Sequence, residues 1–353
     1  MFSQASHSST SSASGSAPGN GSAPGRSTRR KAWRLRSIAV LAACVAALVA
    51  PMSARADWPE RQVKLIVTFP PGSANDAAAR IFADALGKKW GKPVVVEDRP
   101  GAEGTIGVGS FIANQDDHTL LYTVAGSITV APLLVDRLPY DVNHDLVPIA
   151  ATTEIVLTLA VSSQLSVTSI PELIVALRTS PEKYAWASGP TLPRYVFSAF
   201  LKQHGLKMNF VSYRDASQPQ ADLGEGRIQA LLTSLTASSS PVQAGKARFL
   251  AVANPGRAAT LPDTKTVREL GYPELEIAGL AGIFGGKAFS EALRIRIAAD
   301  VAAICRDADV RRKLETSGHN VLNGSTEELK QGIEKQRAAV NEITKVIDIR
   351  NPQ

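Results

Sequence analysis

The sequence predicts an α/β fold with largely parallel sheets, and three observations support this prediction. Strand-like apolar runs alternate with amphipathic, helix-like segments from residue 57 to the end. Glycine and proline mark the turns between them, for example at residues 70–72. The 297 residues that follow position 56 suffice for two domains, and no linker divides them. We therefore expect two lobes joined by chain crossings.

The first part of this region predicts three strands and two helices. The strands are expected at residues 63–69, 94–97 and 119–124. A helix is expected from about Asn75, and a second at residues 105–114. The first helix carries an apolar face made of Ile81, Phe82, Ala85, Leu86 and Trp90.

The rest of the chain repeats this pattern. Residues 149–162 form one long β-branched run, and Ser169 is a capping residue at the start of a helix. Ser325 and Glu328 stand at capping-box spacing and begin the last helix. Further strands are expected at residues 184–187, 209–212, 228–233 and 248–253.

Residues 1–56 have the features of a secretory signal peptide. Basic residues gather at positions 29–36, an apolar run of 13 residues spans positions 38–50, and Ala54 and Ala56 form a small-x-small site. A membrane span needs about 20 apolar residues. We expect cleavage near Ala56 and a periplasmic location, with a lipid anchor at Cys44 and twin-arginine export as open alternatives.

The net charge excludes one class of partner. Seven of the 39 basic residues lie in residues 1–56, which contain no acidic residue. The rest of the chain therefore balances 32 basic against 32 acidic residues. Because a nucleic-acid-binding domain usually carries a basic patch, we expect no nucleic-acid partner.

Signatures of enzymes and metal sites are absent from the sequence. There is no H-E-x-x-H, G-x-S-x-G or G-x-G-x-x-G motif, and the glycines around Lys287 do not form a phosphate loop. The four histidines after position 56 are far apart, which argues against a metal site. Cys305 lies in a helical pattern and is interpreted as a core residue. We expect no enzymatic activity, cofactor or metal.

The loop at residues 69–76 is the first candidate binding element. A strand ends there, the backbone turns at Gly72, and Ser73 precedes a helix. Free backbone N–H groups at a helix start favour an anion, and ligands of α/β sheets gather at the carboxyl ends of strands. The loop therefore predicts an anion-binding element, although an ordinary capped loop would look the same.

Several sequence blocks resemble the tripartite tricarboxylate transporter receptor family, also called Bug solute-binding proteins. The most specific is D-R-P-G-A-x-G-x-I-G, within residues 94–109. The resemblance covers nearly all of residues 58–349, with further blocks at residues 69–80, 116–123, 140–150, 210–215, 223–229, 244–254 and 261–273.

This resemblance implies a two-lobed periplasmic-binding-protein fold, similar to type II. We expect lobe one at residues 57–157 plus 283–353 and lobe two at residues 158–282, with hinge crossings near 155–161 and 276–284. The family implies a receptor that closes on a small, carboxylate-bearing or polar molecule and delivers it to a two-component membrane permease. We expect it to be a monomer. A receptor for a signalling partner and a lyase-type enzyme on the same scaffold are the alternatives.

The resemblance also implies which loops line the cleft. In lobe two the family has a glycine-rich loop followed by histidine, whereas this chain has Arg194 at about that place. We interpret Arg194 as a ligand contact. The expected ligand-binding residues are Phe69, Gly72, Ser73, Asp76, Ala125, Gly126, Ser127, Ser188, Gly189, Thr191, Arg194 and Tyr213.

Overall fold

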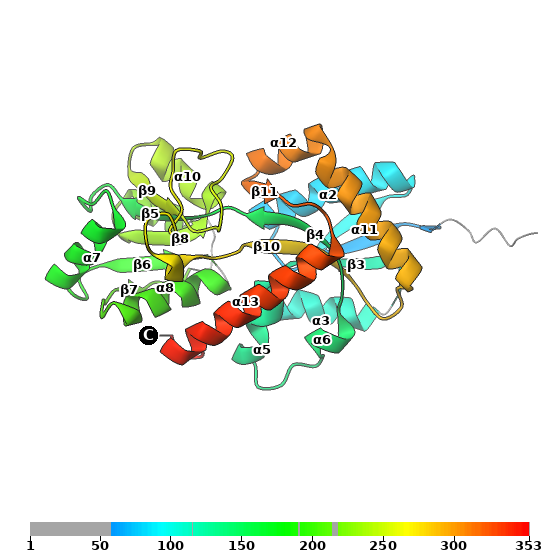
Figure 1. Ribbon diagram of the computed structural model, residues 1–353, viewed down its shortest axis with the longest axis horizontal. Helices are drawn as coiled ribbons and strands as arrows, with labels where there is room; N and C mark the ends of the chain where they lie inside the picture. Colours follow the sequence, from blue (N-terminus) through cyan, green and yellow to red (C-terminus); the bar gives the residue numbers. More distant parts are fainter. Residues whose placement is uncertain (1–57, 115, 190, 214–217, 353) are drawn as a thin grey trace, which may run out of the picture. The chain divides into compact units, whose positions relative to one another are not determined.

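The strands form two mixed sheets in a computed structural model, which describes residues 58–114, 116–189, 191–213 and 218–352 (Figure 1). The predicted signal peptide lies outside the described residues. The first sheet has the order β11-β4-β10-β3-β1-β2 and contains β1 (Val63–Val67), β2 (Val94–Asp98), β3 (Thr119–Val124), β4 (Val147–Ile155), β10 (Leu280–Gly285) and β11 (His319–Val321). The second has the order β7-β6-β8-β5-β9 and contains β5 (Leu157–Ser162), β6 (Ala185–Ser188), β7 (Asn209–Phe210), β8 (Ala230–Ser234) and β9 (Ala247–Val252).

The direction of the strands follows from how the chain enters each sheet. In the first sheet β1 pairs in parallel with β2 and β3, as expected for strands separated by crossover helices. By contrast, β10 runs antiparallel to β3 and β4, and β5 runs antiparallel to β8 and β9. The sheets are therefore mixed and not largely parallel as predicted, and antiparallel pairs gather at the strands next to the crossings, where the chain enters a sheet from the other one.

Helices cover both faces of the first sheet. Along β1, Leu65 and Val67 pack with Phe82 on one face, whereas Ile66 packs with Val108 on the other. This alternation is the period of two expected for a strand that is buried on both sides. The helical segments are α2 (Ala74–Trp90), η1 (Ala102–Gly104), α3 (Thr105–Asn114), α4 (Gly126–Thr129), α5 (Ala131–Leu134), α6 (Val142–Asp145), α11 (Glu291–Arg306), α12 (Ala308–Thr316) and α13 (Thr326–Val346).

The second sheet is covered in the same way. Trp186, Phe197 and Phe200 form an aromatic core on one face, and Leu223 and Leu231 pack together on the other. The helical segments here are α7 (Ile170–Thr179), α8 (Leu192–Gln203), α9 (Gln218–Gly224), α10 (Leu235–Gln243) and η2 (Pro273–Leu275).

The chain passes between the sheets at two adjacent places. The predicted long strand at residues 149–162 divides at Val156 into β4 of the first sheet and β5 of the second. The return crossing leads into β10, and the Ile155 N–H donates to the Gly279 carbonyl at 2.9 Å. The two crossings are therefore hydrogen-bonded to each other, an arrangement that suits a hinge.

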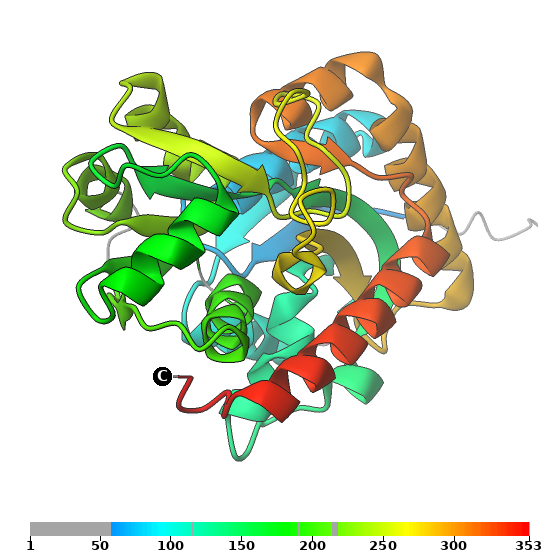
Figure 2. The same ribbon diagram turned by 60° about the vertical axis from the view of Figure 1, so that its left-hand side comes forward.

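The last helix packs against both cores. Ser325 caps α13 by accepting a hydrogen bond from the Glu328 N–H at 3.1 Å. Near the start of α13, Leu329 packs with the first sheet's core, whereas Val340 and Ile343 pack with Phe197 in the second. Figures 1 and 2 show α13 running past β10 toward α8. The C-terminal residues thus join both cores, a role that the assignment of residues 283–353 to lobe one did not include.

Among the described residues, no helix combines the length and the apolar character that a membrane span requires.

Candidate functional site

The loop between β1 and α2 is held in shape by its own side chains. Gly72 adopts a left-handed φ of 78°, and the Asp76 carboxylate accepts a hydrogen bond from its N–H at 2.7 Å. Ser73 caps α2 by accepting from the Asp76 N–H at 3.2 Å. Arg80 pairs with Asp76 at 2.7 Å. Asp76 is thus a structural partner of the loop, and its carboxylate is already engaged.

Two further residues of this loop are buried. Phe69 is 8% exposed, and Asn75 is 4% exposed with a side-chain oxygen that has no partner among the described residues. A buried polar atom without a partner costs free energy, so Asn75 offers a group for a ligand or a water molecule to satisfy. Asn75 was not among the predicted contacts.

The segment after β3 lies against the second sheet's loop. Ala125 is fixed to the first sheet by its N–H, which donates to the Leu280 carbonyl at 2.8 Å. A Cβ atom at Gly126 would lie 2.9 Å from the Thr191 hydroxyl oxygen, so the two segments touch. Ser127 is 0% exposed, and its hydroxyl has no partner within the described part of the chain.

The segment after β6 lies on the other side of this contact, in the second sheet. Gly189 donates its N–H to the Leu232 carbonyl at 2.9 Å, and the Ser188 hydroxyl has no partner among the residues described. Thr191 precedes α8 with a φ of 63°, which is rare for a threonine. The predicted contacts Gly126 and Thr191 are therefore brought together, each from a different sheet.

Arg194 and Tyr213 already have partners within the second sheet's residues. The guanidinium of Arg194 lies 4.4 Å from the centre of the Phe210 ring, a cation–π contact. The hydroxyl of Tyr213 donates to Asp222 at 2.7 Å. Burial and this hydrogen bond raise the pKa of Tyr213, so it remains a phenol. A ligand contact of Arg194 or Tyr213 stays a prediction.

Glu103 adds a contact that the sequence did not suggest. Its carboxylate accepts a hydrogen bond from the Thr191 N–H at 2.6 Å, which joins η1 of the first sheet to the start of α8. Burial raises the pKa of Glu103, whereas the Thr191 N–H and the charge of Arg194 act in the opposite direction. Burial and the Glu103 charge in turn raise the pKa of Tyr195 to about 12. The junction therefore contains one carboxylate supplied by the protein.

No cluster of metal-ligating side chains occurs among the residues that the structure describes. The His118 ring is hydrogen-bonded to the Asp117 carboxylate at 2.7 Å, and the His204 ring is hydrogen-bonded to the Glu274 carboxylate at 2.8 Å. Burial raises the pKa of the Cys305 thiol to about 12, which keeps it protonated at neutral pH. A thiol in this state is a poor nucleophile.

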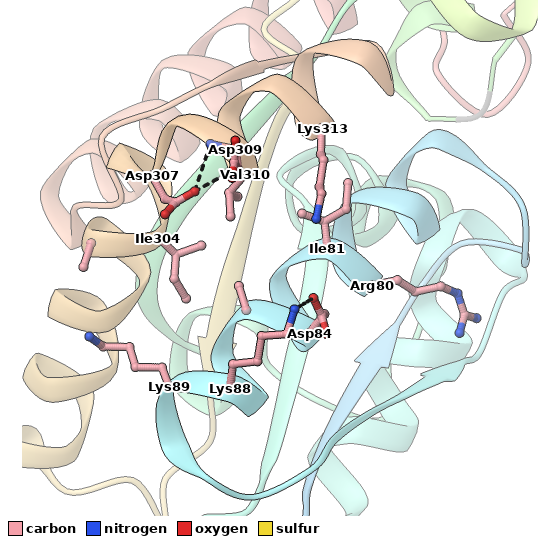
Figure 3. Close-up of a pocket in the computed structure, with 12 residues that line it drawn as sticks. Arg80, Ile81, Asp84, Lys88, Lys89, Ile304, Asp307, Asp309, Val310 and Lys313 are labelled. Atoms are coloured by element: carbon pink, nitrogen blue, oxygen red, sulfur yellow. Dashed lines mark hydrogen bonds and ion pairs between the residues drawn. The ribbon is translucent and has the colours of Figure 1, made fainter.

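A groove of about 590 Å³ between α2 and α12 is a competing candidate (Figure 3). Lys88 and Lys89 line it from α2, and Lys313 lines it from α12. The acidic residues of the groove have local partners, however. Asp84 pairs with Lys88 at 2.7 Å, and Asp307 caps α12. These acidic groups therefore have structural roles. The junction of Gly126 and Thr191 joins loops at strand ends, where α/β sheets bind ligands, and is the better candidate.

A family model described as the tripartite tricarboxylate transporter family receptor matches residues 78–349. The chain belongs to this family. Protein BugT of Bordetella pertussis is 31% identical over 245 residues, which is 68% of this chain and 75% of that protein. A UPF0065 protein of Bordetella bronchiseptica is 30% identical over 231 residues, which is 65% of this chain and 69% of that protein.

Solved structures of similar proteins have the same fold. R. palustris Rpa4515 with adipate is 26% identical, with a TM-score of 0.75 over 82% of this chain and 98% of that one. The periplasmic binding protein BugD is 23% identical, with a TM-score of 0.70 over 81% of this chain and 99% of that one. The resemblance seen in the sequence and the predicted α/β binding-protein fold are therefore confirmed. The chain is a tripartite tricarboxylate transporter family receptor with solute-binding proteins as structural relatives.

Proposed function

We propose that this receptor binds a small carboxylate at the junction of its two sheets and delivers it to a two-component membrane permease. The observation that carries the proposal is the meeting of loops from opposite sheets, where Gly126 lies against Thr191. These loops follow the carboxyl ends of β3 and β6, where α/β sheets bind ligands. The adipate in the structure of Rpa4515 supports a carboxylate as the ligand class.

The polar groups of the junction suit this role. The buried hydroxyl of Ser127 and the buried side-chain oxygen of Asn75 have no partners among the described residues. The hydroxyl can donate to a carboxylate, whereas the Asn75 oxygen accepts and needs a donor elsewhere on the ligand or a water molecule. A ligand that satisfies them and also reaches the unpartnered Ser188 hydroxyl of the second sheet gains all of these contacts only when the two sheets' loops are close together. Closure then follows from contacts that exist in the closed state alone. We expect the receptor to act as a monomer, without a cofactor.

A thermal-shift screen against mono-, di- and tricarboxylates tests the proposal. A carboxylate at 100 times its dissociation constant should stabilise the protein by about 2.7 kcal/mol. The neutral amide of the same acid serves as the matched control and should have little effect. Mass spectrometry should recover the ligand unchanged after long incubation. Conversion of the ligand in proportion to protein concentration would favour the lyase-type alternative, and stabilisation by neither acid nor amide would contradict the proposal.

We also propose that the chain is exported and cleaved after Ala56. The support is the sequence pattern of residues 1–56, in which a basic segment, an apolar run and a small-x-small site follow one another. Intact-mass analysis of protein from the periplasm should give a chain that begins at Asp57. A cytoplasmic protein that retains residues 29–50 would contradict this, and a lipid-modified Cys44 would identify a lipoprotein instead.

A further inference from the structure

Glu103 has an unusual backbone conformation. It lies in η1 with a φ of 55°, directly after Ala102 with a φ of 47°. Thr191, the residue that it contacts, has a φ of 63°. Left-handed backbone is disfavoured for residues other than glycine and tends to occur at functional sites. Both sides of the Glu103–Thr191 contact are therefore strained.

The contact has the form of anion binding at a helix start. The N-terminus of a helix carries unpaired N–H groups and a partial positive charge, which favour a carboxylate. In the described structure, the Thr191 side chain makes no capping hydrogen bond to α8. The Glu103 carboxylate instead accepts a hydrogen bond from the backbone N–H of Thr191, the cap residue itself, at 2.6 Å. It comes from the other sheet, as the carboxylate of a ligand in the cleft would.

Stability alone does not explain the contact. Burial disfavours the charged form of Glu103, as the direction of its pKa shows. The hydrogen bond from the Thr191 N–H and the charge of Arg194 offset this only partly, because the pKa of Glu103 is still raised. Glu103 therefore combines two unfavourable features, a carboxylate removed from water and a left-handed backbone.

Ser127 is an independent observation at the same place. A Cβ atom at Gly104, the residue after Glu103, would lie 2.8 Å from the Ser127 Cβ, so Ser127 packs against the turn that carries Glu103. Its hydroxyl is completely buried and has no partner within the described residues. A buried donor of this kind calls for a further group, such as a ligand or a water molecule.

We propose that Glu103 is a built-in occupant of the anion subsite at the start of α8 and determines the specificity of the receptor. This inference rests on the proposed function. Because the subsite is filled by a carboxylate of the protein, a second carboxylate on the ligand is repelled. The receptor therefore selects molecules with one carboxylate, whose other end meets Glu103 with a hydrogen-bond donor such as an ammonium or hydroxyl group.

The first test is rescue by acetate. Glu103→Gly empties the subsite and also suits the left-handed backbone, so the variant should fold as well as the wild type. Acetate should then raise the melting temperature of Glu103→Gly in a saturable way, relative to chloride at equal ionic strength. The wild type, whose subsite is filled by Glu103, should respond less, and only through the site for the ligand's own carboxylate. Glu182→Gly is the matched control, because Glu182 is an exposed glutamate with a φ of 62°.

The second test compares adipate with 6-aminohexanoate, which differs in having an ammonium group at one end. By calorimetry, the wild type should prefer 6-aminohexanoate. Glu103→Gly should shift the ratio of the two affinities toward adipate by about tenfold or more, equivalent to about 1.4 kcal/mol. Glu103→Gln keeps an acceptor for the Thr191 N–H without the charge, and it should shift the ratio in the same direction.

The outcomes separate this inference from the proposed function. An acetate effect that is absent, or equal in all proteins, would overturn the subsite, and an unchanged affinity ratio would overturn the role in specificity. Rescue by acetate without binding of any carboxylate to the wild type would keep the subsite and reject the proposed function. Binding of a carboxylate to the wild type without rescue by acetate would keep the proposed function and reject the subsite.

Discussion

Replacing Asn254 by alanine should lower the free energy of unfolding by about 4 kcal/mol. The Asn254 side chain is 0% exposed. Its oxygen accepts from the Leu157 N–H at 2.7 Å, and its nitrogen donates to the Ile155 carbonyl at 2.9 Å. These two backbone groups flank Val156, where the chain leaves the first sheet for the second. The variant loses both hydrogen bonds and leaves a buried donor and a buried acceptor without partners, each of which costs about 1–3 kcal/mol.

Urea unfolding followed by circular dichroism measures this change. Asn341→Ala removes an exposed asparagine from the middle of α13 and is the matched control. It should change stability by less than about 0.5 kcal/mol. A loss of less than about 1 kcal/mol in Asn254→Ala would mean that water or a neighbouring group replaces the amide, and that Asn254 does not fix the crossing.

The helix starts were predictable because their signals are local. Ser169 and Ser325 were predicted as capping residues, and both accept a hydrogen bond from the N–H three residues later. Such a cap needs only one side chain and the first turn of its own helix. One detail differs, since the Glu328 carboxylate accepts from the Asn323 N–H and not from Ser325. The capping box is therefore half formed.

The division of the run at residues 149–162 was not predictable from local pattern, and the expected crossing near residues 155–161 came from the family resemblance. Apart from Glu154, the residues near Val156 are apolar or β-branched, and no glycine or proline marks the end of β4. The partner that fixes the crossing is Asn254, which lies 97 residues from Leu157 in the sequence. A periodicity that is read along the chain contains no information on such a contact.

The candidate site was also predictable only in part. The loop after β1 was expected because it follows a strand end, and the loops after β3 and β6 were expected from the family resemblance. Gly126 indeed lies against Thr191. Glu103 was missed because its contact depends on left-handed backbone at two residues that are not glycine, and on a partner 88 residues away. A glutamate after an alanine gives no sign of such a turn. Which of these residues touch the ligand stays a prediction.

Replacing Gly126 by valine should weaken carboxylate binding by about 1,000-fold, equivalent to about 4 kcal/mol. A Cβ atom at this position would lie 2.9 Å from the Thr191 hydroxyl oxygen and 3.1 Å from its Cβ, and valine adds two further methyl groups. The opposing loops then cannot approach each other, so a ligand keeps only the contacts of one sheet. Titration calorimetry with a carboxylate found in the thermal-shift screen measures the loss.

The fold itself should tolerate this change, because Gly126 lies in α4 and its backbone is not in the left-handed region. The variant's far-UV circular dichroism should therefore match that of the wild type, and any loss of affinity then reports on closure. Gly256→Val is the matched control, since a Cβ atom there meets nothing within 4 Å, and it should bind as the wild type does. Equal affinity in Gly126→Val and the wild type would show that the ligand does not need Gly126 and Thr191 in contact, and that the bound state is more open than the structure described here.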